Sequence, residues 1–325
     1  MSDQPKSHLR QSQETDVQTD FPSPVLVTGG AGFIGSHLVE ELSKLGLEVT
    51  VLDNLSSGSR TNLAGVCPRV KLVTGDVRDW ELILKLTQNV STVFHLAAMA
   101  SVPLSQSDPE SCLDINGRGT LSVMRACVES GVTRLVYASS SAVYGDLPAP
   151  HREDQLPRPN TPYAAIKLLG EHLGLFYREN HNLSTVSLRY FNVYGPRQSA
   201  DGADAGVIPI FVKALTEGRA PIIYGDGTQT RDFIHVSDVV RATIAAARAP
   251  DPGDGVFNVA TGCDATVLEV LGLLRSNYPK APQAVHLPAR PGDPLSSRGQ
   301  TTKATERLGF SSCLSLAEGL LNLCS

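Results

Sequence analysis

The sequence predicts an α/β fold, a doubly wound parallel sheet with a smaller, loop-rich C-terminal domain. Apolar runs alternate with helical patterns through the first half of the 325-residue chain, and a glycine-rich turn follows the first run. Several runs are continuously apolar, which is typical of strands covered by helices on both faces. The alternation favours parallel strands joined by right-handed crossovers. The expected strands are Val25–Thr28, Val49–Leu52, Val70–Thr74, Thr92–Leu96, Leu135–Ala138 and Thr185–Leu188.

Helical periodicity separates these strands and then fades in the second half of the chain. The expected helices are Phe33–Leu45, Trp80–Thr87, Ser111–Ser130 and Tyr163–Asn180. Beyond them lie Pro- and Gly-rich stretches and the short strands Pro221–Tyr224 and Val256–Val259. We therefore expect a disordered tail over 1–23, a nucleotide-binding domain over 24–188 and a mainly substrate-binding domain over 189–325. Residues 230–250 are expected to return to the nucleotide-binding domain.

The turn after the first strand carries glycines at positions 29, 32 and 35. A strand, a glycine turn and a helix start in this order form a pyrophosphate site of the Rossmann type. Gly29 permits the tight turn, Gly32 lets a phosphate approach the backbone, and Gly35 lets the helix pack on the strand. Asp53 ends the second strand, 24 residues after Gly29, near the position of the acid that binds an adenosine ribose. This acid favours NAD over NADP; a plain turn followed by a solvated Asp is the alternative.

Composition excludes several classes of function. Hydrophobic residues make up 41% of the chain and the net charge is −5, which gives no electrostatic reason to expect a nucleic acid or an anionic membrane as partner. No apolar run approaches the roughly 20 residues of a spanning helix, and the polar N-terminus is no secretory signal. The scattered cysteines predict free thiols and a cytoplasmic location. The histidines show no metal-ligand spacing, so no metal is expected.

Tyr163 and Lys167 lie four residues apart at the start of a predicted helix, and therefore share one face. A lysine cation near a phenol lowers the pKa of the phenol, which then exchanges a proton more readily. Ser140 lies 23 residues before Tyr163, where a strand runs into a polar loop. The alternatives are an amphipathic helix surface and, for Ser139 and Ser141, serines that only satisfy a turn.

These blocks together resemble the extended short-chain dehydrogenases/reductases that modify nucleotide sugars. The resemblance covers about residues 24 to 320 and is strongest to UDP-hexose 4-epimerases, above all those that accept UDP-N-acetylglucosamine. It is carried by the glycine turn, Asp53-Asn54, the Gly75–Asp79 block, His95–Ala98, the serine loop and the Tyr163–Lys167 pair. It continues through Arg189–Arg197, a uridine-side loop over 198–209 and the Gly225–Val236 block.

The resemblance implies a role for each matching residue. The residues implied to bind NAD are Gly29, Gly32, Phe33, Ile34, Asp53, Asn54, Asp76, Val77, Leu96, Ala97, Ala98, Tyr163 and Lys167. Tyr163, Lys167 and Ser140 are the implied catalytic residues. The residues implied to contact the UDP-sugar are Ser140, Ser141, Asn192, Val207, Arg231, Arg290, Asp293 and Ser297. Arg231 and Arg290 suit a diphosphate because guanidinium groups match phosphate oxygens.

The implied reaction is inversion of C4 of a UDP-sugar through a 4-keto intermediate. Dehydratases of the group carry an Asp-Glu pair where this chain has Ser141-Ala142, which argues against dehydration. UDP-glucuronate 4-epimerase or decarboxylase activity and a non-catalytic NAD-binding scaffold remain alternatives. Ser297 lies where a small residue leaves room for an N-acetyl group, whereas Leu295-Ser296 and Gln300 depart from the pattern of the group.

The resemblance also implies a homodimer through the helices expected over 111–130 and 163–180. Apolar residues that suit such a four-helix contact, or that alternatively face the sheet, are Leu121, Val123, Met124, Leu168, Leu169, Leu173 and Phe176.

Overall fold

A computed structural model describes residues 23–66, 68–202, 205–250, 252, 255–289 and 295–323. Arg290, Asp293 and residues 1–22 of the expected tail lie outside the described residues.

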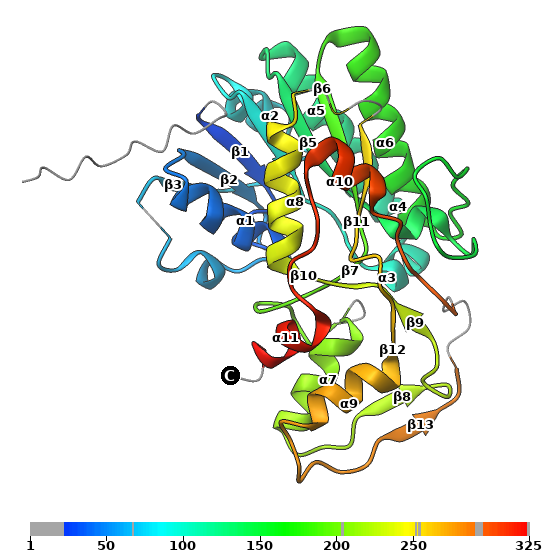
Figure 1. Ribbon diagram of the computed structural model, residues 1–325. Helices are drawn as coiled ribbons and strands as arrows, with labels where there is room; N and C mark the ends of the chain where they lie inside the picture. The colour runs from blue at the N-terminus through cyan, green and yellow to red at the C-terminus, as the bar shows by residue number, and fades with distance from the viewer. Residues whose placement is uncertain are drawn as a thin grey trace, which may run out of the picture.

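Seven parallel strands form one central sheet (Figure 1) in the order β11-β6-β5-β4-β1-β2-β3. The strands are β1 (Val25–Thr28), β2 (Val49–Asp53), β3 (Val70–Thr74), β4 (Thr92–His95), β5 (Arg134–Ser140), β6 (Ser184–Tyr190) and β11 (Val256–Val259). The strand order reverses between β1 and β4. In open α/β sheets, ligands bind outside the carboxyl ends of the strands at such a switch point. The predicted fold class is therefore confirmed.

Helices cover both faces of the sheet and bury two separate apolar clusters. On one face pack α1 (Phe33–Lys44), α8 (Val236–Arg248) and α10 (Thr302–Leu308), around Leu38, Val239 and Ala304. On the other face pack α2 (Trp80–Thr87), α5 (Gly119–Glu129) and α6 (Pro162–His181), around Ile83, Val123 and Tyr177. β1 and β4 are buried along their whole length, and helices on both faces explain why residues 25–27 and 93–94 are apolar.

Two elements differ from the sequence expectation. Val256–Val259 was expected in the loop-rich half, but as β11 it pairs with β6 at the edge of the main sheet. The helix expected over 111–130 is α4 (Pro109–Cys112), a π-helical segment η2 (Leu113–Arg118) and α5. The segment contains Asn116, whose side chain bonds to the backbone of a neighbouring loop. A π-helical stretch inside an α-helix is frequent at functional sites.

A smaller lobe lies beyond the carboxyl ends of the strands (Figure 1). Its helices α7 (Val207–Thr216), α9 (Val267–Arg275) and α11 (Leu316–Leu321) share an apolar core with Phe211, Val270 and Leu320. Three short strand pairs complete the lobe and join it to the sheet domain. They are β7 (Asn192–Tyr194) with β10 (Phe233–His235), β8 (Ile222–Tyr224) with β13 (Val285–Leu287), and β9 (Thr230–Arg231) with β12 (Ala265–Thr266).

Three further short elements are α3 (Val102–Ser107), η1 (Arg60–Leu63) and η3 (Ser141–Tyr144). No helix within the described residues combines the length and hydropathy that a membrane crossing requires.

Candidate active site

The glycine turn joins β1 to α1, and its backbone leaves room for a ligand on one side. Gly29 has a φ of +72°, and a Cβ added there would lie 2.7 Å from the backbone nitrogen of Ala97. A Cβ on Gly35 would lie 2.1 Å from the carbonyl oxygen of Gly29, so Gly35 packs α1 against the turn itself. A Cβ on Gly32 would meet only that same carbonyl, at 3.2 Å. The Gly32 side of the turn is therefore open to a phosphate group.

Asp53 ends β2 beside this turn and braces it. Its Oδ2 accepts a hydrogen bond from the backbone N–H of Ala31 (2.9 Å), and its Oδ1 accepts one from that of Leu55 (2.8 Å). Each carboxylate oxygen has a second lone pair, which a ribose hydroxyl can use. Within the described chain, Gly32 begins α1 without a side-chain cap, so the helix N-terminus keeps donors for an anion. The open turn, the uncapped helix and the carboxylate fit a dinucleotide.

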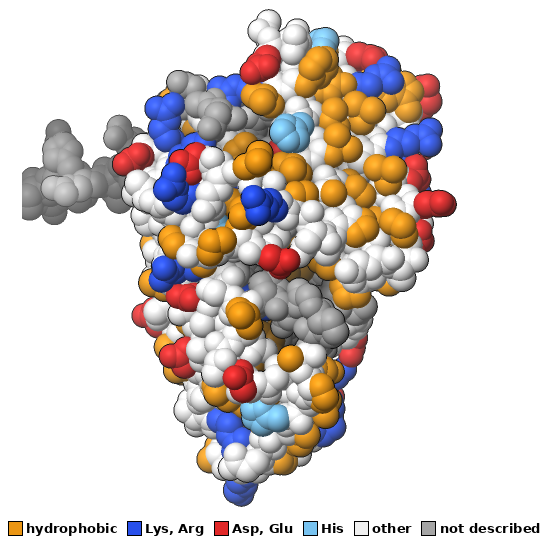
Figure 2. All heavy atoms as spheres, turned by 90° about the vertical axis from the view of Figure 1, so that its right-hand side faces the viewer, with side chains coloured by type: hydrophobic (Ala, Val, Ile, Leu, Met, Phe, Trp, Pro, Cys, Tyr) orange, Lys and Arg blue, Asp and Glu red, His pale blue; other side chains and the backbone are white. Residues whose placement is uncertain are grey.

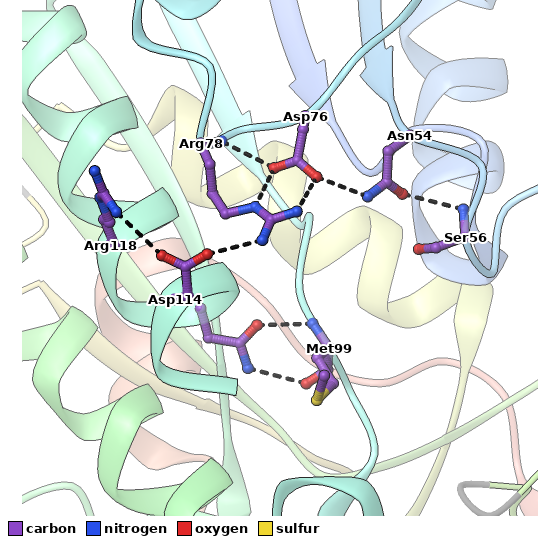
Figure 3. A network of polar contacts seen from close by, with 8 residues as sticks. Asn54, Ser56, Asp76, Arg78, Met99, Asp114 and Arg118 are labelled. Atoms are coloured by element: carbon purple, nitrogen blue, oxygen red, sulfur yellow. Dashed lines mark hydrogen bonds and ion pairs between the residues drawn. The ribbon is translucent and has the colours of Figure 1, made fainter. Parts of the chain in front are cut away.

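A chain of ion pairs follows β3 (Figure 3). Asp76 accepts hydrogen bonds from Asn54 Nδ2 (3.0 Å) and from Arg78 Nε (2.8 Å), and Arg78 Nη1 donates to Asp114 (2.8 Å). The hydrogen bonds from Arg78 hold the pKa of Asp76 well below its usual range. Val77 points the other way, into the apolar cluster under α5. The structure thus places Asn54 and Asp76 together, but it buries the side chain of Val77 in the core.

The segment Leu96–Ala98 leaves β4 next to the glycine turn, and a buried polar relay supports it. Thr28 Oγ1 bonds His95 Nδ1 (2.7 Å) and accepts a bond from the backbone N–H of Ala97 (3.3 Å). On its other side, His95 Nε2 bonds Thr120 Oγ1 (3.0 Å). Burial lowers the pKa of His95 to about 3, so the ring is neutral at neutral pH.

Asn116, in the π-helical segment, fixes the end of the same loop. Its Oδ1 accepts from the backbone N–H of Met99 (2.7 Å) and its Nδ2 donates to the carbonyl of Met99 (2.9 Å). Sequence reasoning missed Asn116 and the relay through His95. The available signal was the position of Asn116 in the predicted helix. It is a polar residue that follows Ile115 and precedes Gly117 and Gly119.

Tyr163 and Lys167 lie on one face of α6, as expected. Thr161 caps this helix by accepting a bond from the backbone N–H of Ala164 (3.2 Å), and Pro162 occupies its first turn. Lys167 Nζ donates to the carbonyl of Ala138 in β5 (2.7 Å) and lies 5.8 Å from the centre of the Tyr163 ring. Ser140 lies near enough to the phenol to lower the pKa of Tyr163, and all three predicted catalytic residues lie at the carboxyl end of β5.

The electrostatics of this group differ from the prediction. Burial raises the pKa of Tyr163 to about 12, and the nearby Ser140 hydroxyl offsets only part of this rise. Burial also lowers the pKa of Lys167 to about 8. The expectation that Lys167 lowers the pKa of the Tyr163 phenol is therefore wrong for this structure, because desolvation of the phenol outweighs any effect of the ammonium, which is bonded to a carbonyl.

On the side of the smaller lobe, Asn192, Arg231 and Ser297 come together around one backbone segment. Asn192 Nδ2 donates to the carbonyl of Asp232 (3.2 Å), and the backbone N–H of Asp232 donates to the carbonyl of Ser297 (2.7 Å). Arg231 Nη1 donates to the carbonyl of Thr230 (2.8 Å). The two remaining expected substrate contacts lie elsewhere: Val207 begins α7 and Ser141 begins η3.

Ser139 does more than satisfy a turn. Its hydroxyl donates to the buried carboxylate of Glu171, which is paired with Arg189. Sequence reasoning missed this pair, since Glu171 looked like one of several charges on a helix. Within the described residues, no group of three or more His, Cys, Asp or Glu side chains is arranged to hold a metal ion.

Comparison with known proteins identifies the family. Residues 25–260 match the model of the NAD dependent epimerase/dehydratase family. The chain belongs to this family. The expected resemblance, the NAD-dependent enzyme class and NAD as cofactor are thereby confirmed.

Relatives within the family include UDP-sugar 4-epimerases. A UDP-glucose 4-epimerase of Mycolicibacterium smegmatis is 40% identical over 300 residues, which span 91% of this chain and 95% of that protein. A structure of UDP-N-acetylglucosamine 4-epimerase from Methanobrevibacter ruminantium, in complex with UDP-N-acetylmuramic acid, superposes with a TM-score of 0.88 at 36% identity, covering 93% of this chain and 98% of that one. The Thermus thermophilus UDP-glucose 4-epimerase in complex with NAD has a TM-score of 0.85 at 40% identity, covering 92% and 97%.

Proposed function

We propose that this protein is an NAD-dependent UDP-sugar 4-epimerase that inverts C4 of UDP-N-acetylglucosamine or UDP-glucose through a 4-keto intermediate. The observation that carries the proposal is the grouping of Tyr163, Lys167 and Ser140 at the carboxyl end of β5. This edge lies beside the switch point of the sheet, where the family binds its cofactor. Acid–base candidates grouped at a cofactor fold favour an enzyme over a scaffold.

NAD would lie along the carboxyl ends of the strands, from the end of β3 to the start of α6. The backbone at Gly29, Gly32, Phe33 and Ile34 would hold its pyrophosphate, because the turn is open there and α1 begins uncapped. Asp53 and Asn54 would hold the adenosine ribose, with Asp76 and the backbone of Val77 near the adenine. Leu96, Ala97 and Ala98 would line the path to the nicotinamide, whose ribose would bond Lys167.

In the mechanism, Tyr163 acts as its phenolate, which the positive charges of Lys167 and of bound NAD would favour. It takes the proton from the O4 hydroxyl of the sugar and later returns it to the same oxygen. Ser140 bonds the same oxygen and holds it within reach of the phenol. Lys167, with a pKa of about 8, is mostly protonated at pH 7 and supplies positive charge close to the phenol. When bound, NAD supplies a positively charged ring that accepts a hydride from C4 and gives it back. The keto sugar must rotate about its phosphate link between the two transfers.

The smaller lobe would hold the UDP. Asn192, Arg231 and Ser297, which lie around the backbone of residues 230–232, and Val207 at the start of α7 would contact it. Arg290 and Asp293, outside the described residues, follow β13 in the sequence. A guanidinium suits a diphosphate. Ser297 lies next to the end of β9. Because its side chain is small, it would leave room for a sugar with a bulky 2-substituent.

One assay tests the activity. The purified protein is incubated in turn with UDP-glucose, UDP-N-acetylglucosamine and UDP-glucuronate, and the nucleotide sugars are separated by chromatography. We expect the C4 epimers of the first two. Release of carbon dioxide from UDP-glucuronate would identify a decarboxylase instead. NAD released on denaturation without turnover of any of the three would favour a scaffold.

We further propose a homodimer through α4, α5 and α6. Figure 2 shows hydrophobic side chains gathered on the face that carries α4 and α6 in Figure 1. Leu121, Leu169 and Phe176 are exposed there, whereas Val123 and Met124 are buried against the sheet. A hollow of about 470 Å³ on this face is lined by Leu113, Leu121, Leu169 and Leu173 among others. Exposed apolar area of this kind marks interfaces, and sedimentation velocity of the purified protein decides between monomer and dimer.

A further inference from the structure

A row of buried polar side chains crosses the carboxyl ends of three neighbouring strands, behind the serine loop. In the sheet register, Ser139 of β5 lies opposite Arg189 of β6, and Arg189 lies opposite Asn258 of β11. Glu171 faces this row from α6, two helical turns after Tyr163. The row therefore lies directly beside the proposed catalytic residues but contains none of them.

The centre of the row is a two-pronged ion pair. Arg189 Nε donates to Glu171 Oε1 (2.9 Å), and Arg189 Nη2 donates to Glu171 Oε2 (2.7 Å). Ser139 Oγ donates to the same Oε1 at 2.5 Å. All three residues are at most 5% exposed. Burial lowers the pKa of Arg189, but its hydrogen bonds to Glu171 and the charge of that carboxylate raise the pKa by more. The net pKa therefore lies above its ordinary value, and the guanidinium stays charged.

The same ion pair reaches the far end of the serine turn. Arg189 Nη1 donates to the hydroxyl of Tyr144 (2.9 Å), and the guanidinium lies 4.8 Å from the centre of the Tyr144 ring. The hydroxyl of Tyr144 in turn donates to Asn258 Oδ1 (2.7 Å). Tyr144 is the last residue of η3, and Ser140 caps the start of that turn. The Glu171–Arg189 pair thus holds Ser139, the residue before Ser140, and Tyr144, the last residue of the turn that follows Ser140.

Stability alone gives little reason for such a pair. Removing two charges from water costs several kcal/mol each, and apolar residues of similar volume are often as stabilising. A buried pair does, however, fix the position of every group that bonds to it. Here those groups are Ser139 and Tyr144, which are the two ends of the segment that presents Ser140.

We propose that the Glu171–Arg189 pair positions the catalytic serine: by holding Ser139 and Tyr144, it fixes the hydroxyl of Ser140 against that of Tyr163. This inference rests on the proposed function, because it gives Ser140 and Tyr163 their catalytic task. Glu171 and Arg189 touch neither sugar nor cofactor in this scheme. They act through Ser139 and Tyr144.

The test uses Ser139→Ala and Tyr144→Phe in the full-length protein with its bound NAD, because each removes one hydroxyl and leaves the ion pair intact. We expect kcat to fall by about tenfold to a hundredfold, since small misplacements at a reaction centre have effects of this size. The KM for the UDP-sugar should stay within about twofold. The acidic limb of the kcat pH profile, along which Tyr163 loses its proton, should move to higher pH, because Ser140 lowers the pKa of Tyr163 and a displaced Ser140 would lower it less. Ser187→Ala is the matched control: Ser187 is also buried, on β6, and within the described residues its hydroxyl has no part in this network.

Hydrogen–deuterium exchange of the peptide over 139–145 gives a readout that does not depend on turnover. We expect faster exchange in Ser139→Ala and Tyr144→Phe than in the wild type and in Ser187→Ala. Unchanged exchange would overturn the anchoring of the turn, even if the wild type proved inactive on every UDP-sugar. Faster exchange with wild-type kcat and pH profile would overturn the positioning role while leaving the proposed function intact.

Discussion

The two ends of the proposed dinucleotide site place their charges in opposite environments. At the catalytic end, Lys167, Glu171 and Arg189 are buried and bonded to fixed partners. At the adenosine end, Arg78 and Asp114 form ion pairs with side chains about 40% exposed. Ion pairs in water contribute little and are screened by salt, whereas a buried pair cannot lose one partner without a large penalty. The comparison indicates that the catalytic end is held rigidly for chemistry, whereas the adenosine end is adjustable.

The largest contrast should come from Tyr163→Phe, which removes only the phenolic hydroxyl. We expect the epimerisation rate to fall by about 10²- to 10⁴-fold, the range that a positioned acid–base group supplies. The rate is measured by chromatography at saturating UDP-sugar, with the NAD content of both proteins determined after denaturation. Near-normal turnover at equal NAD content would refute the role of Tyr163.

Breaking an ion pair should cost more free energy of unfolding at the buried catalytic end than at the exposed adenosine end. Arg189→Met leaves the Glu171 carboxylate buried without its partner, and we expect it to lower the free energy of unfolding by about 3–5 kcal/mol. Arg78→Met, at the exposed end, should lower it by about 1 kcal/mol or less. Urea unfolding measures both.

The double variant Glu171→Met/Arg189→Met is the control for this comparison. Since it removes both charges of the pair, it should be more stable than Arg189→Met alone. A double variant that is less stable than either single variant would contradict the assignment of the penalty to an uncompensated charge.

The pH dependence of stability sharpens the comparison further. Burial lowers the pKa of Lys167 from 10.5 to about 8, so between pH 8 and 10.5 the unfolded chain binds more protons than the folded one. Folding stability attributable to this residue therefore rises with pH across that window, by about 3 kcal/mol. Urea unfolding of NAD-free wild type and Lys167→Met at pH 7.5 and 10 should show this rise in the wild type only. Parallel curves for the two proteins would mean that Lys167 titrates normally.

The smallest effect is expected at the exposed end. Asp114→Asn weakens the ion pair that orients Arg78 and, through it, Asp76. We expect NAD to bind about two- to fivefold more weakly, and added NaCl should reduce the difference by screening. Calorimetric titration of the NAD-free proteins measures both quantities. A salt-independent loss larger than tenfold would indicate that Asp114 belongs to a rigid part of the site.

Local sequence patterns predicted what depends on short distances along the chain. The glycine turn with Asp53, the strands from Val25 to Leu188, and the placement of Tyr163 and Lys167 on one face of α6 all follow from periodicity and spacing. What sequence reasoning missed depends on contacts between distant segments. Ser139 bonds Glu171, which lies 32 positions away in the sequence, and Tyr144 bonds Asn258, which lies 114 positions away. No local sequence pattern indicates such partners.

Burial also reversed one prediction. From the sequence, Lys167 was expected to lower the pKa of Tyr163, because a cation one helical turn away favours the phenolate. The fold adds a desolvation cost that spacing cannot reveal, and in this structure that cost is the larger effect. The strand expected over Val256–Val259 is present, but its place beside β6 could not be predicted for a similar reason, since a short apolar strand does not specify its pairing partner.

Transfer of the C4 hydrogen is the most direct test of the proposed chemistry. The UDP-hexose that is turned over fastest is labelled with deuterium at C4 and incubated in ordinary water, and the C4 epimer is examined by mass spectrometry and NMR. Oxidation and reduction at C4, with Tyr163 handling only the hydroxyl proton, predict that the epimer retains its deuterium. Loss of the label to solvent would show that C4 is deprotonated instead, and would contradict the proposed mechanism.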